Sequence, residues 1–119
     1  MDKDMSLDEL DVQDLIDEIR FYGGEVDENG YVTLYHNTSK ESAEAIRKTG
    51  KMIAKEDGIF FSTKPDGYAS GYGSVSLKFK IPAHKLELDD VFDGEAHLRM
   101  PLKNRKQAVN VREYLQPED

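Results

Sequence analysis

Carboxylates, imidazoles and phenols are the side chains through which this chain could do chemistry, because its 119 residues include no cysteine. The absence of cysteine excludes thiolate nucleophiles, disulfide frameworks and zinc held by thiolates. Gly71 and Gly73 lack the Gly-Lys-Ser context of a phosphate-binding loop, and no serine nucleophile elbow is present. The acids from Asp89 to Glu95 could hold a divalent cation, but they lack the Asp-x-Asp-x-Asp-Gly order of a calcium loop. We therefore expect no resident metal ion.

Three places combine polar and aromatic groups that could face a ligand. His36 stands where a β-prone run gives way to polar residues. Tyr68 and Tyr72 lie one helical turn apart, and a flat apolar ring with a polar tip suits a planar amide ligand. Glu95 and His97 are two residues apart, so they share a face if their segment is a strand. The structural alternatives are a histidine satisfied at a strand end for His36 and tyrosines at the edge of the core for Tyr68 and Tyr72. Asp89 and Asp90 are further candidates, and a turn or loop is the simpler explanation for them.

The net charge of −8 is concentrated at the N-terminus. Residues 1–30 carry 11 of the 24 acids and 2 of the 16 bases, a charge of −9, so residues 31–119 carry +1. Acidic chains are poor general binders of nucleic acid, because phosphate contacts need clustered Lys and Arg. The basic run from Arg99 to Arg112 is more typical of a solvated surface than of a phosphate contact. With neither an apolar signal core nor a membrane-length apolar stretch, a cytoplasmic location is expected.

The elements that must position these groups follow from periodicity and turn chemistry. Residues 6–22 are predicted as an acidic amphipathic helix, begun by a Ser6/Glu9 capping box and ended by Gly23-Gly24. A hairpin is expected over residues 26–36, with a type I′ turn at Asn29-Gly30. A second helix is expected over about residues 40–48, with Thr38 as its cap and Gly50 as its stop.

Short strands account for most of the rest. They are expected at residues 59–62, 74–81, 96–102 and 109–111, with a loop or short strand around residues 86–92 and one helical turn at residues 68–72. The alternation in 74–81 puts Val75, Leu77, Phe79 and Ile81 on one face. The sum is α+β, with a small curved or split antiparallel sheet rather than a doubly wound parallel one. We expect an N-terminal helical segment, 1–24, and a single globular unit, 25–119.

Three segments, taken in their order along the chain, resemble the ADP-ribosyltransferase-like superfamily. They are Leu34-Tyr35-His36-Asn37-Thr38, Gly58-Ile59-Phe60-Phe61-Ser62-Thr63 and Tyr68-Ala69-Ser70-Gly71-Tyr72-Gly73. The resemblance is to its diphtheria-toxin and PARP-like branch, which has a His–Tyr–acid triad, and it covers about residues 31–102. It implies that the sheet is of the ADP-ribosyltransferase type. It also implies that NAD is the substrate, that nicotinamide is released and that ADP-ribose passes to an acceptor.

The resemblance also implies roles for individual residues. His36 matches the family histidine that binds the adenosine ribose, and Asn37 stands where the family often has glycine. Tyr72 matches the tyrosine that stacks on nicotinamide, with Tyr68 as the competing candidate. The expected nucleotide-binding residues are His36, Asn37, Thr38, Phe61, Ser62, Tyr68, Tyr72 and His97. Of Phe60 and Phe61, one should enter the core and the other could line the pocket.

The third position of the triad is assigned to Glu95, whose carboxylate would accept from the hydroxyl of the nicotinamide ribose. The expected catalytic residues are therefore His36, Tyr72 and Glu95. His97 is the competitor for that third position. With His97 there, the chain could bind NAD without catalysis or use a variant reaction.

The resulting expectation is an NAD-dependent ADP-ribosyltransferase that modifies an unknown macromolecule, more readily a protein than a nucleic acid. Small stand-alone members of the superfamily are often toxins, effectors or phage-encoded modifiers of host proteins. One alternative is a non-catalytic acidic module that occupies a basic protein surface. Another is the tRNA 2′-phosphotransferase branch, whose basic clefts are not evident here.

Overall fold

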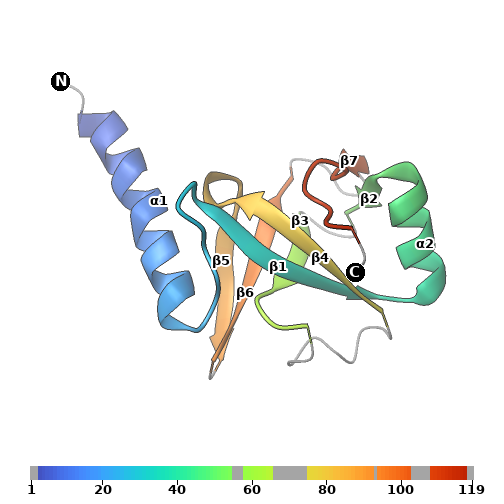
Figure 1. Ribbon diagram of the computed structural model, residues 1–119. Coiled ribbons are helices and arrows are strands. Elements are labelled where there is room, and N and C mark those ends of the chain that lie inside the picture. The colour runs from blue at the N-terminus through green and yellow to red at the C-terminus, as the bar shows by residue number, and fades with distance from the viewer. Residues whose placement is uncertain (1–2, 55–57, 66–74, 93, 103–107, 118–119) are drawn as a thin grey trace.

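The computed structural model describes residues 3–54, 58–65, 75–92, 94–102 and 108–117, and Figure 1 shows their arrangement. The helices are α1 (Lys3–Phe21) and α2 (Lys40–Thr49), with a 3-10 turn, η2 (Ala83–Lys85). The strands are β1 (Tyr31–Thr38), β2 (Lys51–Ile53), β3 (Gly58–Ser62), β4 (Val75–Pro82), β5 (Glu87–Phe92), β6 (Glu95–Pro101) and β7 (Ala108–Asn110). Five strands form a sheet in the order β4-β1-β3-β6-β5, and β2 pairs with β7. All these pairings are antiparallel, which confirms the α+β class with an antiparallel sheet.

Strand β1 joins two parts of this sheet. It pairs with β4 along its whole length, from Tyr31 opposite Pro82 to Thr38 opposite Val75. It meets β3 in register only where Tyr35 lies opposite Ser62. Beside the first half of β1 runs the segment 24–27, whose Glu25 carbonyl accepts from the Thr33 amide at 2.9 Å. The β4–β1 pair is therefore linked to the β3–β6–β5 part over a short stretch.

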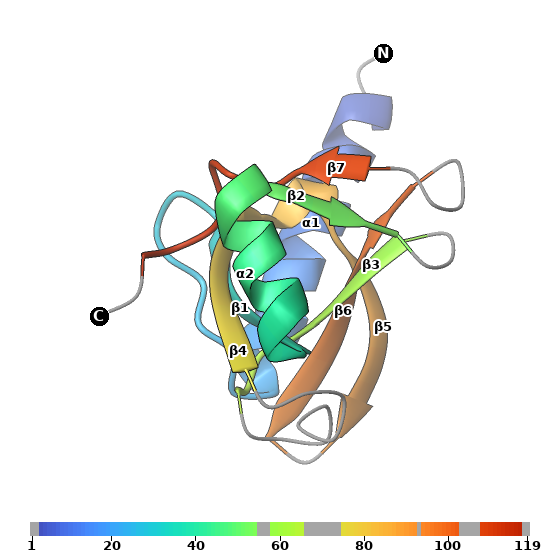
Figure 2. The ribbon, with the colours of Figure 1, turned by 90° about the vertical axis from the view of Figure 1, so that its right-hand side faces the viewer.

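A single hydrophobic cluster joins the sheet to both helices. Leu77, Phe79 and Ile81 of β4 are fully buried, as the alternation predicted, and Val75 is partly buried against them. The cluster includes Ile16 and Ile19 from α1 and Ala43 and Ile46 from α2. Figure 2 shows α2 in front of β1 and β4, with α1 behind the sheet. Burial of this apolar surface is the main stabilisation available to a chain of this size.

Helix α1 differs from the prediction at its start and agrees at its end. It begins at Lys3, so Ser6 lies inside the helix and the predicted capping box is wrong. Its end is a Schellman motif, in which Gly24 N–H donates to the Ile19 carbonyl and Gly23, at φ 90°, donates to the Arg20 carbonyl. The first turns of α1 extend beyond the sheet (Figure 1). From the part of the helix whose side chains are described, Val12, Leu15, Ile16 and Ile19 pack on the core.

The hairpin before β1 forms at the predicted place with a different turn. The Gly30 amide donates to the Asp27 carbonyl at 3.0 Å, so Glu28 and Asn29 are the central residues. Gly30 follows at φ 83°. This is the three-residue connection, a type I turn followed by a left-handed residue, and the type I′ prediction was wrong. The Asp27 carboxylate stabilises the turn by accepting from the amides of Asn29 and Tyr31.

The structure around α2 also differs from the prediction in two details. Thr38 is the last residue of β1, and Ser39 is the N-cap, whose hydroxyl accepts from the Ser42 amide at 3.1 Å. The helix ends as predicted at Gly50, which has φ 70°. The β2–β7 pair was not expected as a unit, because β2 has only three residues. Within the described residues, neither helix has the length and apolarity that a membrane span needs.

Candidate functional site

Three of the predicted site residues meet where β3 ends and β6 begins. The Ser62 hydroxyl donates to Glu95 Oε2 at 2.9 Å, and His97 Nε2 lies 2.5 Å from the same oxygen. The Ser62 hydroxyl in turn accepts from the Lys64 amide at 3.1 Å. We call Ser62, Glu95 and His97 the carboxylate cluster. Its members come from two strands that are neighbours in the sheet.

The register of the strands explains why these side chains converge. Antiparallel partners point to the same face of a sheet. Ser62 is the partner of His97, and Tyr35 is the partner of Ser62, so all three share one face. Glu95, two residues before His97, joins them, which confirms the shared face predicted for this pair. His36 follows Tyr35 in β1 and therefore starts from the opposite face.

Burial sets the electrostatics of the carboxylate cluster. Glu95 is 2% exposed, and the side chain of His97 is 20% exposed. A buried carboxylate is stable only when hydrogen bonds replace its lost water, and Ser62 and His97 supply two of them. His97 is the member of the cluster that reaches solvent. The cluster therefore offers a carboxylate in a fixed position and an imidazole that is hydrogen-bonded to it.

His36 is hydrogen-bonded to the neighbouring strand, β3. Its Nδ1 donates to the Phe60 carbonyl at 2.9 Å, across the place where β1 and β3 lack a regular ladder. Its ring meets Phe61 edge-on at 5.9 Å between centroids. Because Nδ1 carries the proton in this bond, Nε2 is the acceptor atom of the neutral ring. The side chain therefore has a fixed tautomer and orientation at the middle of the sheet.

Asn37 and the two phenylalanines occupy distinct environments. Asn37 shares the face of Tyr35 by alternation, and its Nδ2 is buried without a hydrogen-bond partner within the described part of the chain. Phe61 is 3% exposed and packs on Phe79 at 5.3 Å, so this expected nucleotide contact is a core residue. Phe60 is 38% exposed. By alternation Phe60 points to the face of the carboxylate cluster.

One predicted part of the site lies outside the described residues, and one contributor to the site was not predicted. Tyr68 and Tyr72 lie outside the described residues, so their predicted contacts stay predictions. Phe92 was missed, and its ring packs 4.9 Å from that of His97, with Phe92 paired opposite Glu95. The signal for it was the Asp93-Gly94 dipeptide, a common hairpin turn, between Phe92 and Glu95. That turn would have placed the two residues opposite each other.

The comparisons with known proteins give no relative for this chain. It matches no protein-family model, no curated protein and no solved structure. Among the described residues, no group of three or more His, Asp or Glu side chains is arranged to hold a metal ion.

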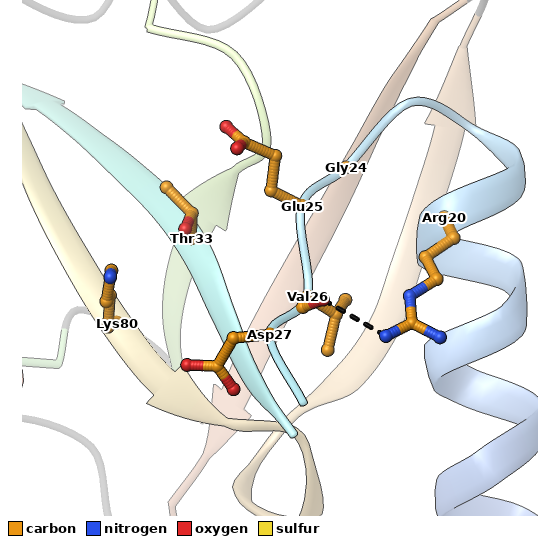
Figure 3. A pocket seen from close by; sticks show the side chains of 7 residues that line it. All are labelled: Arg20, Gly24, Glu25, Val26, Asp27, Thr33 and Lys80. Atoms are coloured by element: carbon orange, nitrogen blue, oxygen red, sulfur yellow. Dashed lines mark hydrogen bonds between the residues drawn. The ribbon is translucent and has the colours of Figure 1, made fainter. Parts of the chain in front are cut away.

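A cavity of about 350 Å³ lies elsewhere, where α1 passes into β1 (Figure 3). Its lining contains none of the predicted site residues: Arg20, Gly24, Glu25, Val26, Asp27, Thr33 and Lys80. Arg20 donates to the Val26 carbonyl at 3.0 Å, and the Asp27 carboxylate holds the hairpin turn. These charged groups stabilise the connection from α1 to β1. The cavity is not part of the candidate site.

Proposed function

We propose that this protein is an NAD-dependent ADP-ribosyltransferase that releases nicotinamide and passes ADP-ribose to an acceptor. The observation that carries the proposal is the carboxylate cluster, in which a buried glutamate is fixed by a histidine on its own strand, β6, and by a serine on the neighbouring strand, β3. The resemblance of residues 31–102 to the superfamily supports the same reaction and an ADP-ribosyltransferase type of sheet. NAD is the substrate in this reaction.

The reaction sets a demand that Glu95 is suited to meet. When the bond between C1′ of the ribose and the nicotinamide nitrogen breaks, nicotinamide leaves with the electron pair and the ribose becomes positively charged. A carboxylate already held in place stabilises such charge without reorganising during the reaction. The bonds from Ser62 and His97 both go to Oε2, so the orientation of the Glu95 carboxylate is fixed before a ligand arrives. Glu95 is therefore assigned the catalytic role.

Other groups on the same strands are suited to binding NAD. The exposed ring of Phe60 offers an apolar surface for a planar base or amide. Nδ2 of Asn37 is buried without a partner among the described residues, and such a donor is costly to leave unpaired, so in this proposal the side chain turns to meet a ligand carbonyl. His36, whose Nδ1 is held by the Phe60 carbonyl, is the proposed contact for ribose hydroxyls, as the resemblance implies. Tyr72 completes the proposed set as the nicotinamide-stacking residue.

Release of nicotinamide from NAD tests the proposal. The purified chain is incubated with labelled NAD, alone and with a cell lysate, and nicotinamide and labelled macromolecules are measured. We expect nicotinamide release, and a Glu95→Gln variant should lose turnover far more than binding, because the carboxylate acts on charge formed in the transition state. Glu44→Gln, an exposed position on α2, is the matched control and should resemble the wild type. Intact NAD under all conditions would refute the enzyme assignment.

A second candidate function is a non-catalytic acidic module. The observation that favours it is that α1 carries acids along its length while its first turns extend beyond the sheet (Figure 1). Such a helix could occupy a basic protein surface. The same assay separates the two functions, because the module would leave NAD unchanged.

A further inference from the structure

The two ring nitrogens of His97 have different surroundings. Nε2 lies 2.5 Å from Oε2 of Glu95, an oxygen that also accepts from Ser62, so the proton of the neutral ring belongs on Nε2. Nδ1 is then the lone-pair atom, and it points away from Glu95. Within the described residues, Nδ1 has no hydrogen-bond partner. The ring of this partly exposed side chain thus combines an anchored N–H with a second, basic nitrogen.

The surroundings of His97 hold this ring in one orientation. Glu95 fixes one edge, and the ring of Phe92 packs 4.9 Å away at a tilt of 59°. Ser62 lies directly opposite on β3 and holds the carboxylate to which His97 is bound. The side chain is 20% exposed, in contrast to the 2% of Glu95. A carboxylate that orients a partly exposed imidazole through one nitrogen is an arrangement that makes the other nitrogen a general base.

We infer that His97 is the general base that deprotonates the acceptor, and hence that the acceptor is a neutral hydroxyl group. This inference rests on the proposed function. In the step, the acceptor oxygen uses a lone pair to form a bond to C1′ of the ribose. The bond from C1′ to nicotinamide breaks, and nicotinamide leaves with its electron pair. The hydroxyl proton passes to Nδ1 of His97, and Glu95 stabilises the imidazolium that results.

The chemistry of the acceptor is what makes a base necessary. A carboxylate acceptor arrives without a proton and needs no base. A neutral hydroxyl becomes strongly acidic as it bonds to C1′, so a positioned base accelerates its attack by about 10²–10⁴-fold. An oriented, partly exposed imidazole next to the catalytic carboxylate therefore points to an acceptor that must lose a proton, and among such acceptors we infer a neutral hydroxyl.

Small nucleophiles can test this without knowledge of the natural acceptor. NAD is supplied with water alone, with methanol, or with azide, an anion that has no proton to lose. His97→Gln removes the basic nitrogen while its amide can still donate to Glu95, and His84→Gln is the matched control at an exposed histidine. His97→Asn serves as a second variant, and thermal unfolding confirms that each variant is folded.

We expect His97→Gln to lose about 10²–10⁴-fold in hydrolysis and methanolysis of NAD. Azide should restore NAD consumption in this variant, with ADP-ribosyl azide as the product, and should add little to the wild type. His84→Gln should match the wild type throughout.

NAD hydrolysis at the wild-type rate in both folded His97 variants would overturn the inference. A slow variant that binds NAD but is not rescued by azide would overturn it as well, because His97 would then act on cleavage of the nicotinamide bond. If the wild-type protein binds NAD but consumes it with neither water nor azide, the assignment of His97 as a general base is contradicted. If the wild-type protein does not bind NAD, the proposed function itself is refuted.

Discussion

Glu95 and His97 form a hydrogen-bonded pair in which the acid is buried and the imidazole reaches solvent, with 2.5 Å between Oε2 and Nε2. They are two residues apart on β6, and Ser62 on β3 completes the carboxylate cluster. This arrangement links the stability of the sheet to its proposed chemistry. A buried carboxylate that loses a donor destabilises the fold even where no substrate is present.

Ser62→Ala should destabilise the protein by about 1–3 kcal/mol, because it leaves Glu95 with one hydrogen bond fewer in a buried position. The matched control is Ser76→Ala, the same change at an exposed position of β4. Urea unfolding of the two variants measures the difference. Equal midpoints for both variants would show that the hydroxyl of Ser62 does not stabilise the carboxylate.

Asn37→Ala should lower the free energy of unfolding less than the removal of a hydrogen-bonded polar side chain usually does. Because Nδ2 of Asn37 has no partner among the described residues, removing it relieves a buried unpaired donor, and the free energy of unfolding should change by less than about 1 kcal/mol. NAD binding should weaken if a ligand carbonyl is what satisfies this donor. Asn110→Ala is the comparison, since Oδ1 of Asn110 accepts from the Arg112 amide at 3.0 Å and its loss should lower stability. A large loss of stability in Asn37→Ala with unchanged NAD affinity would mean that this side chain is structural.

Phe79→Ala should be among the most damaging core changes. Phe79 is fully buried and packs against Phe61 at 5.3 Å, so truncation leaves a cavity and is expected to reduce stability by about 3–5 kcal/mol. Phe21→Ala, at a ring that is 81% exposed, should change stability by less than about 1 kcal/mol. Chemical denaturation of both variants checks the contrast. Similar losses in the two would contradict the assignment of the core.

Tyr114 gives the protein a pH dependence in the alkaline range. Burial, with help from the hydrogen bond to Glu113 and its charge, raises the pKa of Tyr114 from 10.0 to about 12. The unfolded chain therefore loses this proton before the folded chain does. The associated stability is fully present below pH 10 and is lost as the pH rises toward 12.

By pH 11 the ionisation of Tyr114 in the unfolded chain lowers the free energy of unfolding by about 1 kcal/mol. Tyr114→Phe lacks the titrating group, so its stability should fall less steeply than that of the wild type between pH 9 and 11. Urea unfolding at a series of pH values measures both slopes. Parallel curves would show that Tyr114 ionises equally in the folded and unfolded chains.

The sequence predicted what local pattern controls. The alternation of β4, the glycine ends of α1 and α2, and the shared face of Glu95 and His97 all follow from periods of two or from φ > 0 at glycine, and all are confirmed. The turn before β1 shows the limit, because Asn29-Gly30 is compatible with both the two-residue and the three-residue connection. The side-chain cap from Asp27 accompanies the longer one.

Contacts that depend on which strands pair could not be predicted from the sequence. Ser62 and Glu95 are 33 residues apart, and their hydrogen bond requires β3 and β6 to be neighbours in a particular register. The short strands β2 and β7 likewise exist only as a pair. The opposite starting faces of His36 and Ser62 also depend on the single registered contact between β1 and β3, at Tyr35 and Ser62.

The central claim is that this chain binds NAD, with His36 among the residues that contact it, and calorimetric titration of the purified chain with NAD tests it most directly. The account predicts saturable binding to one site per chain, weakened at least tenfold by His36→Ala and unchanged by His84→Ala, the same substitution at an exposed histidine. Undetectable binding of NAD, or equal affinity in the wild type and His36→Ala, would contradict it.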